Sequence, residues 1–274
     1  MALPTPSPTR TCLVTGASSG IGAEIARTLA ARGHGVTLVA RREERLRVIA
    51  DELTAGHSIR AEVITADLSD QTSRERLVDE VADRGLEVEV LVNNAGLSTM
   101  GPVHRSVAEA ELAMIRTDVE AVVHLCSLFV PAMVERGRGA VLNVASTAAF
   151  QPIPGQAGYG GSKAFVLSYT RAMGAELART GVTATVLCPG PVETEFAATA
   201  GLDEAEAAGV LPKMMWVSAG DVARQAIDAL DRGRSVIIPG AANRVGARLG
   251  AMVPRSVLLP LMTRQHPAMK APKP

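Results

Sequence analysis

The sequence predicts a doubly wound α/β fold, in which helices cover both faces of one parallel sheet. Apolar runs of strand length alternate with segments of helical periodicity along most of the chain. A glycine-rich turn joins the first expected strand to the first expected helix, and the 274 residues, 47% of them apolar, suit one globular domain or at most two small ones. We expect strands near residues 11–15, 35–40, 60–65, 88–93, 139–145, 182–188 and 235–238, and helices near 20–32, 42–55, 70–84, 106–136, 158–180 and 218–232.

The turn over residues 15–22 follows the first strand and predicts a site for the pyrophosphate of a dinucleotide. Gly16 permits a tight turn, Gly20 lets the backbone approach a ligand, and Gly22 lets the helix pack near the strand. The amides at the helix N-terminus would then face the pyrophosphate. The alternative is an ordinary strand–helix turn that contains three glycines. The residues assigned to the cofactor here are Gly16, Ser18, Ser19, Gly20 and Ile21.

The second strand ends in Arg41 and Arg42 rather than in an acidic residue. An acidic residue there would bind a ribose 2′-hydroxyl and select NAD, whereas an arginine accommodates the 2′-phosphate of NADP. Ser18 could add a hydroxyl to that phosphate. The alternative is that both arginines face water beside Glu43 and Glu44. We favour the phosphate interpretation, and therefore NADP over NAD.

Two further turns border the expected cofactor site. Asp67 and Leu68 follow the third strand, and the Asp67 carboxylate can accept a hydrogen bond from an adenine amino group. Alternatively, Asp67 caps the next helix, a role for which Ser69 and Asp70 compete. After the fourth strand, the Asn-Asn-Ala-Gly turn over residues 93–96 has small residues where the backbone would pass close to a ribose.

The catalytic prediction rests on three residues in the middle of the chain. Ser146 follows an apolar run over 140–145 that predicts a buried strand, and Tyr159 and Lys163 stand four residues apart on an expected helix face. A free tyrosine titrates near about 10, and a nearby ammonium lowers that pKa, so the phenol could act as a general acid or base at neutral pH. Ser146 can bind the same substrate oxygen. The alternative is a chance Tyr–Lys pair on a solvated helix face.

In order and spacing, these motifs resemble the short-chain dehydrogenase/reductase family in its single-domain branch. The matching residues are Thr15-Gly-x-x-x-Gly-Ile-Gly22, Asn93-Asn-Ala-Gly96, Ser146, Tyr159-x-x-x-Lys163 and Pro189-Gly190-Pro191-Val192-x-Thr194. The resemblance implies a Rossmann-type sheet of seven strands in the order 3-2-1-4-5-6-7. It also implies that the catalytic side chains gather at the carboxyl ends of the strands.

For the catalytic residues, the resemblance implies that Tyr159 donates or accepts the proton, Lys163 lowers its pKa and binds the nicotinamide ribose, and Ser146 orients the substrate carbonyl. The sequence departs from the family where Asp118 replaces a common asparagine. In the family, the backbone carbonyl at that position helps to hold a water in a proton relay to the lysine, and Asp118 could keep this role. Its carboxylate would raise the pKa of Lys163. Alternatively, Asp118 is a polar residue that bends its helix and is satisfied locally.

For the cofactor, the resemblance implies that Asp67 binds adenine and that Asn93 lines the cleft. Thr194 and the backbone at Val192 would hold the nicotinamide carboxamide. The residues assigned to the cofactor outside the glycine turn are Arg41, Arg42, Asp67, Leu68, Asn93, Ala95, Gly96, Tyr159, Lys163, Pro189, Gly190, Val192 and Thr194.

Residues 193–217 interrupt the alternation of strands and helices, and their length and position predict a mobile lid over the substrate. Met214, Met215 and Trp216 could supply an apolar wall, although Trp216 could instead anchor the next helix. Residues 150–154 lie between two catalytic positions and should border the same pocket. These segments favour an apolar or amphipathic substrate.

Composition narrows the classes of function. The formal net charge is zero, which gives no electrostatic case for binding nucleic acid or an anionic membrane. The three cysteines match no metal pattern and no histidines pair at ligand spacing, so we expect no metal and a reduced, cytoplasmic setting. Residues 1–9 lack the features of a signal peptide and are expected to be a disordered tail. No run reaches the roughly 20 apolar residues of a membrane-spanning helix.

Residues 10–240 are expected to form the Rossmann-fold domain, and residues 241–274 a C-terminal helical extension. Between 243 and 253, basic residues stand on an otherwise apolar helical pattern. This segment could lie on a membrane or cover a partner subunit; we favour a helix packed on its own domain or an oligomer arm over the membrane. In the family, the helices that match 106–136 and 158–180 pair across a two-fold axis, so we expect a homodimer or homotetramer.

The sequence therefore predicts an NADP-dependent oxidoreductase that interconverts a carbonyl and an alcohol of a small molecule, with Tyr159 as general acid/base. One alternative is a non-catalytic NADPH-binding sensor or scaffold, which would need no proton donor. Another is an epimerase or dehydratase of nucleotide sugars, but such relatives usually have a different glycine spacing and a larger C-terminal substrate domain.

Overall fold

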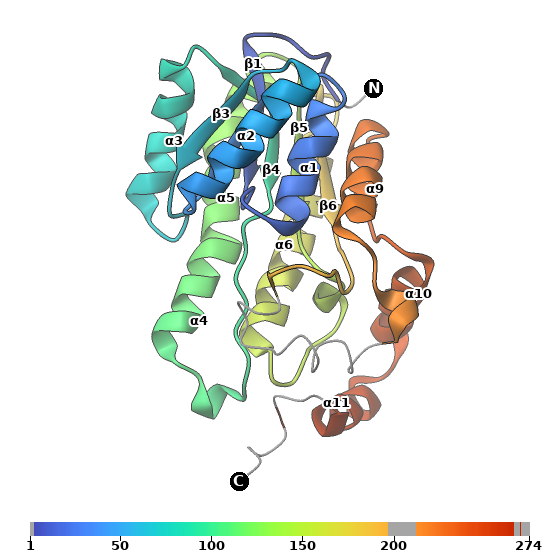
Figure 1. Ribbon diagram of the computed structural model, residues 1–274. Helices are drawn as coiled ribbons and strands as arrows, with labels where there is room; N and C mark the ends of the chain where they lie inside the picture. Colours follow the sequence, from blue (N-terminus) through green and yellow to red (C-terminus); the bar gives the residue numbers. More distant parts are fainter. Residues whose placement is uncertain (1–2, 197–211, 266–268, 270–274) are drawn as a thin grey trace.

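The computed structural model describes residues 3–196, 212–265 and 269. A seven-stranded parallel sheet forms the centre, in the order β3-β2-β1-β4-β5-β6-β7, and helices cover both of its faces (Figure 1). The predicted doubly wound Rossmann-type fold and its strand order are confirmed. The strands are β1 (Arg10–Thr15), β2 (Val36–Ala40), β3 (Ala61–Thr65), β4 (Glu87–Asn93), β5 (Gly139–Val144), β6 (Val182–Leu187) and β7 (Val236–Ile237).

The helices lie close to the predicted ranges. The expected helix over 106–136 is one helical run in which a π-helical turn, η2, separates α4 from α5. The helices are α1 (Gly20–Ala30), α2 (Glu43–His57), α3 (Gln71–Asp83), α4 (Ala108–Ile115), η2 (Arg116–Glu120), α5 (Ala121–Glu135), α6 (Ala157–Glu176), α9 (Ala219–Asp231), α10 (Ala241–Met252) and α11 (Arg255–Gln265), with short 3₁₀ turns η1 (Val103–Arg105), η3 (Thr147–Phe150) and η4 (Lys213–Met215).

The core has two halves, one on each face of the sheet. Successive side chains of a strand point to opposite faces. Cys12 and Val14 therefore pack on the side of α1, α2 and α9, whereas Leu13 between them packs on the side of α3, α5 and α6. Because both faces are covered, the central strands are buried at most positions and mainly apolar, although they also bury polar residues such as Glu89, Asn143 and Thr185.

The helical run Ala108–Glu135 is the one helix, within the part of the chain that the structure describes, that is long and apolar enough to cross a membrane by length and composition. The sequence had led us to expect no such run. The helix lines the core with Leu125, Phe129 and Met133, and it carries the fully buried Asp118. An apolar helix of this length is also found in the cores of proteins without a membrane span, and these core contacts use part of its apolar surface.

Both the N-terminal segment and the C-terminal extension lie largely within the described residues, whereas most of the expected lid does not. Residues 3–9 were expected to be part of a disordered tail, but the structure describes them. Leu3 is partly buried and packs against the half of the core that lies under α1. At the other end, the expected extension folds into α10 and α11. Of the expected lid over 193–217, residues 197–211 lie outside the described residues.

Candidate active site

Ser146, Tyr159 and Lys163 come together at the carboxyl end of β5. Ser146 lies two residues after the end of β5, and its Oγ accepts a hydrogen bond from the Ala148 amide at 3.1 Å, so it caps η3. Tyr159 and Lys163 lie one turn apart on α6, and Lys163 Nζ is 5.6 Å from the centre of the Tyr159 ring. Lys163 Nζ also donates to the Val144 carbonyl at 3.3 Å. The structure thus brings the three predicted catalytic residues into one cluster.

Asp118 forms a buried ion pair with Lys163. The two charged groups are 2.9 Å apart, and their side chains expose 0% and 5% of their surface. Asp118 Oδ1 also accepts a hydrogen bond from the Leu97 amide at 2.7 Å. Asp118 lies in the π-helical turn η2, a distortion that often marks functional sites. A contact with Lys163, on another helix, goes beyond the local role that the sequence left open for Asp118.

The ion pair sets the charge state of Lys163. Burial lowers the pKa of the ammonium, but the Asp118 carboxylate and the Tyr159 phenol outweigh burial, so the pKa of Lys163 is raised. This is the direction that the sequence led us to expect. Lys163 is therefore a permanent cation beside Tyr159 at neutral pH.

The surrounding protein groups raise the pKa of the Tyr159 phenol above its ordinary value. Burial of the phenol is the largest cause; Lys163 and a hydrogen bond with Ser146 lower this pKa, whereas Asp118 raises it. Lys163 does lower this pKa, as the sequence led us to expect, but burial outweighs that effect and Asp118 adds to the burial, so the net direction is upward. A phenol with a raised pKa is protonated at neutral pH, the state that a general acid needs.

The glycine turn between β1 and α1 has the backbone form of an anion site. Gly16 and Gly20 have φ angles of 65° and 57°, in the left-handed region that favours glycine. A Cβ at Gly20 would lie 3.1 Å from Thr194 Cγ2, so the turn faces the segment that follows β6. Ser19, the N-cap of α1, makes no side-chain capping bond, which leaves the first-turn amides of α1 available to a phosphate.

An arginine cluster, consisting of Arg42, Arg45 and Glu195, lies beside this turn. Arg42 Nη2 donates to the hydroxyls of Ser18 at 2.9 Å and Ser19 at 2.7 Å. Its Nη1 contacts the Glu195 carboxylate at 2.8 Å, and Arg45 contacts the same carboxylate at 2.7 Å. The two arginines lower the pKa of Glu195 to about 2. Arg42 thus already binds a negative group next to the predicted phosphate site.

Sequence reasoning missed two members of the arginine cluster. Arg45 lies in the first turn of α2, three residues after the N-cap residue Arg42, so this spacing was a signal that could have found it. Glu195 lies about 150 residues away in the chain, and nothing in its local sequence indicates the contact. Arg41, which we also assigned to the phosphate, is exposed at the end of β2.

Asp67 does not cap a helix. Its Oδ1 accepts hydrogen bonds from the Ser69 amide at 2.9 Å and hydroxyl at 2.8 Å. Burial raises the pKa of Asp67, but the two bonds from Ser69 and the charge of Arg41 together lower it below its ordinary value. The cap of α3 is Asp70, which accepts from the Ser73 amide at 2.7 Å. Asp67 therefore remains an anionic acceptor at the end of β3.

The turn after β4 is fixed to the glycine turn by the Thr15 hydroxyl and by the Asn94 side chain, whose Nδ2 donates to the Thr15 carbonyl at 2.9 Å and to the Gly16 carbonyl at 3.3 Å. Thr15 Oγ1 accepts hydrogen bonds from the amides of Asn94 at 2.9 Å and Ala95 at 3.0 Å. A Cβ at Gly96 would lie 3.2 Å from Lys163 Nζ. The backbone of this turn therefore passes close beside the buried ion pair, and a side chain at Gly96 would crowd Lys163 and Asp118.

Asn93, expected to line the cofactor cleft, has its side chain inside the protein. It exposes 3% of its surface and donates from Nδ2 to Asn143 Oδ1 at 2.8 Å. The reason is that Asn93 is the last residue of β4, directly beside Asn143 of β5. Its amide therefore ties the two central strands together where they reach the site.

The segment after β6 borders both halves of the site. The Pro189 carbonyl accepts a hydrogen bond from the Thr147 amide at 2.9 Å, next to Ser146. The Phe196 ring lies 5.9 Å from the Tyr159 ring at a tilt of 47°. This segment therefore connects the catalytic cluster with the glycine turn. Of the other residues assigned to the cofactor, Ile21 and Val192 are half-buried and Leu68 is buried.

The C-terminal extension also touches this segment. A Cβ at Gly190 would clash with the side chain of Asn243 on α10. Asn243 Nδ2 donates to the carbonyls of Met215 at 2.9 Å and Pro239 at 3.0 Å. Gly190 is thus required for α10 to dock against the site, a role that its assignment to the cofactor did not foresee.

Two further groups of side chains bear on the chemistry of the site, namely potential metal ligands and the thiol of Cys188. Among the described residues, no group of three or more His, Cys, Asp and Glu side chains could hold a metal ion. Cys188, near the site, is buried and free, and burial raises its pKa to about 12. Its thiol is therefore protonated and unreactive at neutral pH.

The family model described as short chain dehydrogenase matches residues 10–205. The chain belongs to the short-chain dehydrogenase family of oxidoreductases. A protein of Streptomyces coelicolor, provisionally named a ketoacyl reductase, is 42% identical over 189 residues, which cover 68% of this chain and 72% of that protein. Sulfoacetaldehyde reductase 2 of Chromohalobacter salexigens is 38% identical over 186 residues, 67% and 73% of the two chains.

Solved structures agree with the family over nearly the whole chain. A short-chain dehydrogenase from Sphingobium yanoikuyae in complex with NADPH superposes with a TM-score of 0.79 at 31% identity, covering 96% of this chain and 99% of that one. A variant of actinorhodin polyketide ketoreductase with NADPH has a TM-score of 0.76 at 32% identity, covering 87% and 98%. These neighbours support a nicotinamide cofactor site in this protein.

Proposed function

We propose that this protein is an NADP-dependent oxidoreductase that interconverts a carbonyl and an alcohol of a small molecule. The observation that carries the proposal is the cluster of Ser146, Tyr159 and Lys163 at the carboxyl end of β5, opposite the glycine turn. A protein that only bound the cofactor would have no use for a half-buried phenol beside an ammonium. The clustering therefore favours catalysis over a sensor or scaffold.

The residues of the glycine turn and the arginine cluster fit a dinucleotide with a 2′-phosphate. The left-handed glycines and the uncapped start of α1 suit the pyrophosphate. Arg42 and Arg45 converge on a single carboxylate, and the same guanidinium groups suit a phosphate. Arg41 adds positive charge nearby. When bound, the nicotinamide would donate or accept the hydride.

The proton steps fall to side chains of this chain. Tyr159 protonates the substrate oxygen during reduction and removes the proton during oxidation. Ser146 Oγ holds the same oxygen, so the carbonyl is oriented before proton transfer. Lys163 Nζ, 5.6 Å from the ring, stabilises the phenolate that Tyr159 leaves behind. The raised pKa of Tyr159 keeps the phenol protonated at neutral pH, the form that reduction of a carbonyl requires.

Asp118 positions the lysine. Its carboxylate and the Val144 carbonyl hold Lys163 Nζ at 2.9 Å and 3.3 Å, which fixes the long side chain beneath Tyr159. In this arrangement Asp118 occupies the relay position that the family fills with asparagine. Because it is an anion, it raises the pKa of Lys163 and Tyr159 together, which asparagine would not do.

The substrate pocket would lie next to Phe196 and the two ends of the expected lid. Phe196 stands 5.9 Å from the Tyr159 ring, and Met214 exposes 76% of its surface at the far end of that segment. These side chains support an apolar or amphipathic carbonyl substrate. The same class is consistent with the relative named a ketoacyl reductase.

We further propose a cytoplasmic homodimer or homotetramer. Leu112 and Ile115 on α4 and Phe165 on α6 are large apolar side chains that expose 52%, 38% and 42% of their surface. The rings of Phe165 and Tyr169 stack 5.7 Å apart on the same face. A two-fold axis through α4 and α6 would cover these side chains.

The purified protein tests the proposal when NADPH absorbance is followed with a panel of aldehydes, ketones, quinones and ketoacyl esters, with NADH in parallel. We expect oxidation of NADPH with one carbonyl class, and a lower kcat/KM with NADH. Tight NADPH binding without turnover on any member of the panel would favour the sensor or scaffold instead. Equal kcat/KM with both cofactors would contradict the NADP preference.

A further inference from the structure

Helix α10 turns its large apolar side chains outward. Asn243 and Ala247, four residues apart, face the protein and expose 1% and 6% of their surface. Val245, Leu249 and Met252 lie on the opposite side of the helix and expose 56%, 57% and 80%. A helix packed only on its own domain buries its large apolar face. The arrangement in α10 is the reverse, so its outer face needs another explanation.

Helix α11 also exposes large apolar side chains. Val257 and Leu261, one turn apart, expose 62% and 52% of their surface. Figure 1 shows α10 and α11 following each other at one end of the molecule, away from the centre of the sheet. We call the five side chains, Val245, Leu249, Met252, Val257 and Leu261, the C-terminal apolar face. Large apolar side chains left exposed on two successive helices mark an interaction surface.

The charge of the same region is one-sided. Residues 232–274 contain eight Lys and Arg and no Asp or Glu, although the whole chain has a net charge of zero. The other 231 residues therefore carry a formal charge of −8. The exposed arginines of α10 and α11 are Arg244, Arg248, Arg255 and Arg264, and none of them forms a salt bridge with a carboxylate among the described residues.

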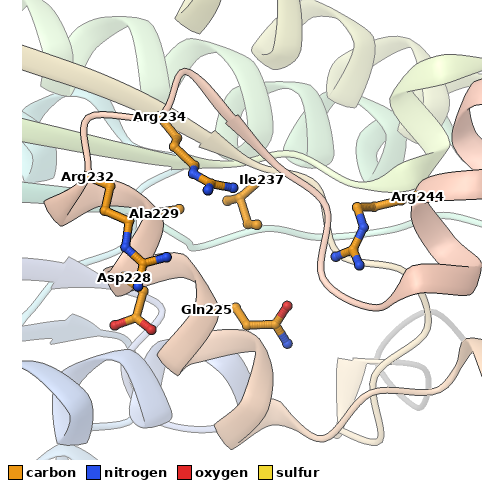
Figure 2. Close-up of a pocket in the computed structure, with 7 residues that line it drawn as sticks. All are labelled: Gln225, Asp228, Ala229, Arg232, Arg234, Ile237 and Arg244. Atoms are coloured by element: carbon orange, nitrogen blue, oxygen red, sulfur yellow. The ribbon is translucent and has the colours of Figure 1, made fainter.

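The positive surface continues onto the neighbouring sheet edge. Figure 2 shows Arg232, Arg234 and Arg244 around a shallow cavity of ≈ 160 Å³ beside β7. The one carboxylate that lines this cavity, Asp228, is paired with Arg32, in the turn that follows α1. Exposed apolar side chains are thus flanked by arginines whose charge the described part of the protein leaves uncompensated.

We propose that α10 and α11 bind the surface of an anionic lipid bilayer. The C-terminal apolar face inserts among the acyl chains near the headgroups, and the arginines contact lipid phosphates. A second copy of this chain is a poorer occupant, because a two-fold contact through this face would place Arg248 and Arg264 near their own symmetry mates. The proposal does not depend on the reaction assigned to Tyr159.

The test is co-sedimentation of the full chain with vesicles of phosphatidylcholine alone and of phosphatidylcholine with phosphatidylserine. We expect the partition coefficient to be at least about tenfold higher with phosphatidylserine and to fall as salt is raised. The double variant Leu249→Ser/Met252→Ser should lose about tenfold or more of this binding. The matched control, Val48→Ser/Val103→Ser, removes side chains of 68% and 72% exposure elsewhere and should bind as the parent does.

A second pair of variants isolates the charge. Arg248→Gln/Arg264→Gln should abolish the preference for phosphatidylserine, whereas Arg47→Gln/Arg224→Gln, at exposed arginines outside the region, should keep it. Circular dichroism and thermal melting would show that all variants are folded. Absence of sedimentation with either vesicle would overturn the proposal. So would an oligomer of the parent that Leu249→Ser/Met252→Ser dissociates while no lipid is bound, since this face would then join copies of the chain.

Discussion

Two ion-pair clusters flank the proposed cofactor site, and they differ in burial. Lys163 and Asp118 are almost completely buried, whereas Arg42 and Glu195 expose 44% and 50% of their side chains. A buried pair loses several kcal/mol when one partner is removed, because the other charge stays behind without solvent. An exposed pair is worth only about 0–1 kcal/mol.

The difference suggests different functions for the two clusters. The Lys163–Asp118 pair is too costly to open during turnover, so it can hold a catalytic side chain in one place. The Arg42–Glu195 contact is weak enough for a ligand phosphate to replace the carboxylate. An ion pair thus holds Lys163 rigidly in the catalytic cluster, whereas another ion pair, in the arginine cluster, can be exchanged for a ligand phosphate.

The largest effect is expected from breaking the buried pair. Lys163→Met leaves the Asp118 carboxylate without its cation and should lower the free energy of unfolding by about 3–5 kcal/mol. Chemical denaturation measures this change. The double variant Lys163→Met/Asp118→Leu removes both charges and should recover most of the loss. Equal stability of the single and double variants would show that the pair does not hold the two helices as described.

A smaller effect is expected on cofactor affinity. Arg42→Gln removes charge-assisted hydrogen bonds worth about 1.5–3 kcal/mol, so the Kd for NADPH should rise about 10- to 100-fold and that for NADH by less than about threefold. Titration calorimetry with both cofactors measures the two constants. Arg47→Gln, on the same helix but paired with Glu43, is the matched control and should leave both unchanged. An equal rise in both constants for Arg42→Gln would place the 2′-phosphate elsewhere.

The pH profile of reduction tests the charge of Asp118. Asp118 raises the pKa of both Tyr159 and Lys163. Reduction needs the protonated phenol, and activity is lost as pH rises through its pKa. Asp118→Asn should therefore move the alkaline limb of kcat/KM to lower pH. A profile that stays in place, or moves to higher pH, would rule out this electrostatic role.

The smallest effect is expected at Glu195. Glu195→Gln removes the carboxylate that competes with a phosphate for Arg42 and Arg45, so NADPH should bind up to about fivefold more tightly, within the range of an exposed pair. NADH affinity should stay the same. Weaker NADPH binding in this variant would mean that Glu195 assists the cofactor instead of competing with it.

The sequence predicted the features that depend on residues close together in the chain. Alternating strands and helices predicted the doubly wound sheet, and the spacing of Tyr159 and Lys163 placed them on one helix face, as found. The family resemblance supplied the strand order, which local periodicity does not contain.

The sequence was uninformative where contacts join distant segments. The pairing of Arg42 with Glu195 and the docking of Asn243 against Gly190 depend on how strands and helices meet in space. The pKa of Tyr159 depends on burial, which a spacing of four residues does not reveal. The outward apolar face of α10 was similarly hidden, because a helical pattern does not say which side the domain covers.

The central claim is that Tyr159 is the general acid/base, and Tyr159→Phe tests it most directly. The substitution removes one hydroxyl from a half-buried ring, so the fold and the cofactor site should be kept. We predict that kcat falls about 10²- to 10⁴-fold while the Kd for NADPH, measured by fluorescence titration, changes less than about twofold. Turnover within about tenfold of the parent would contradict the assignment.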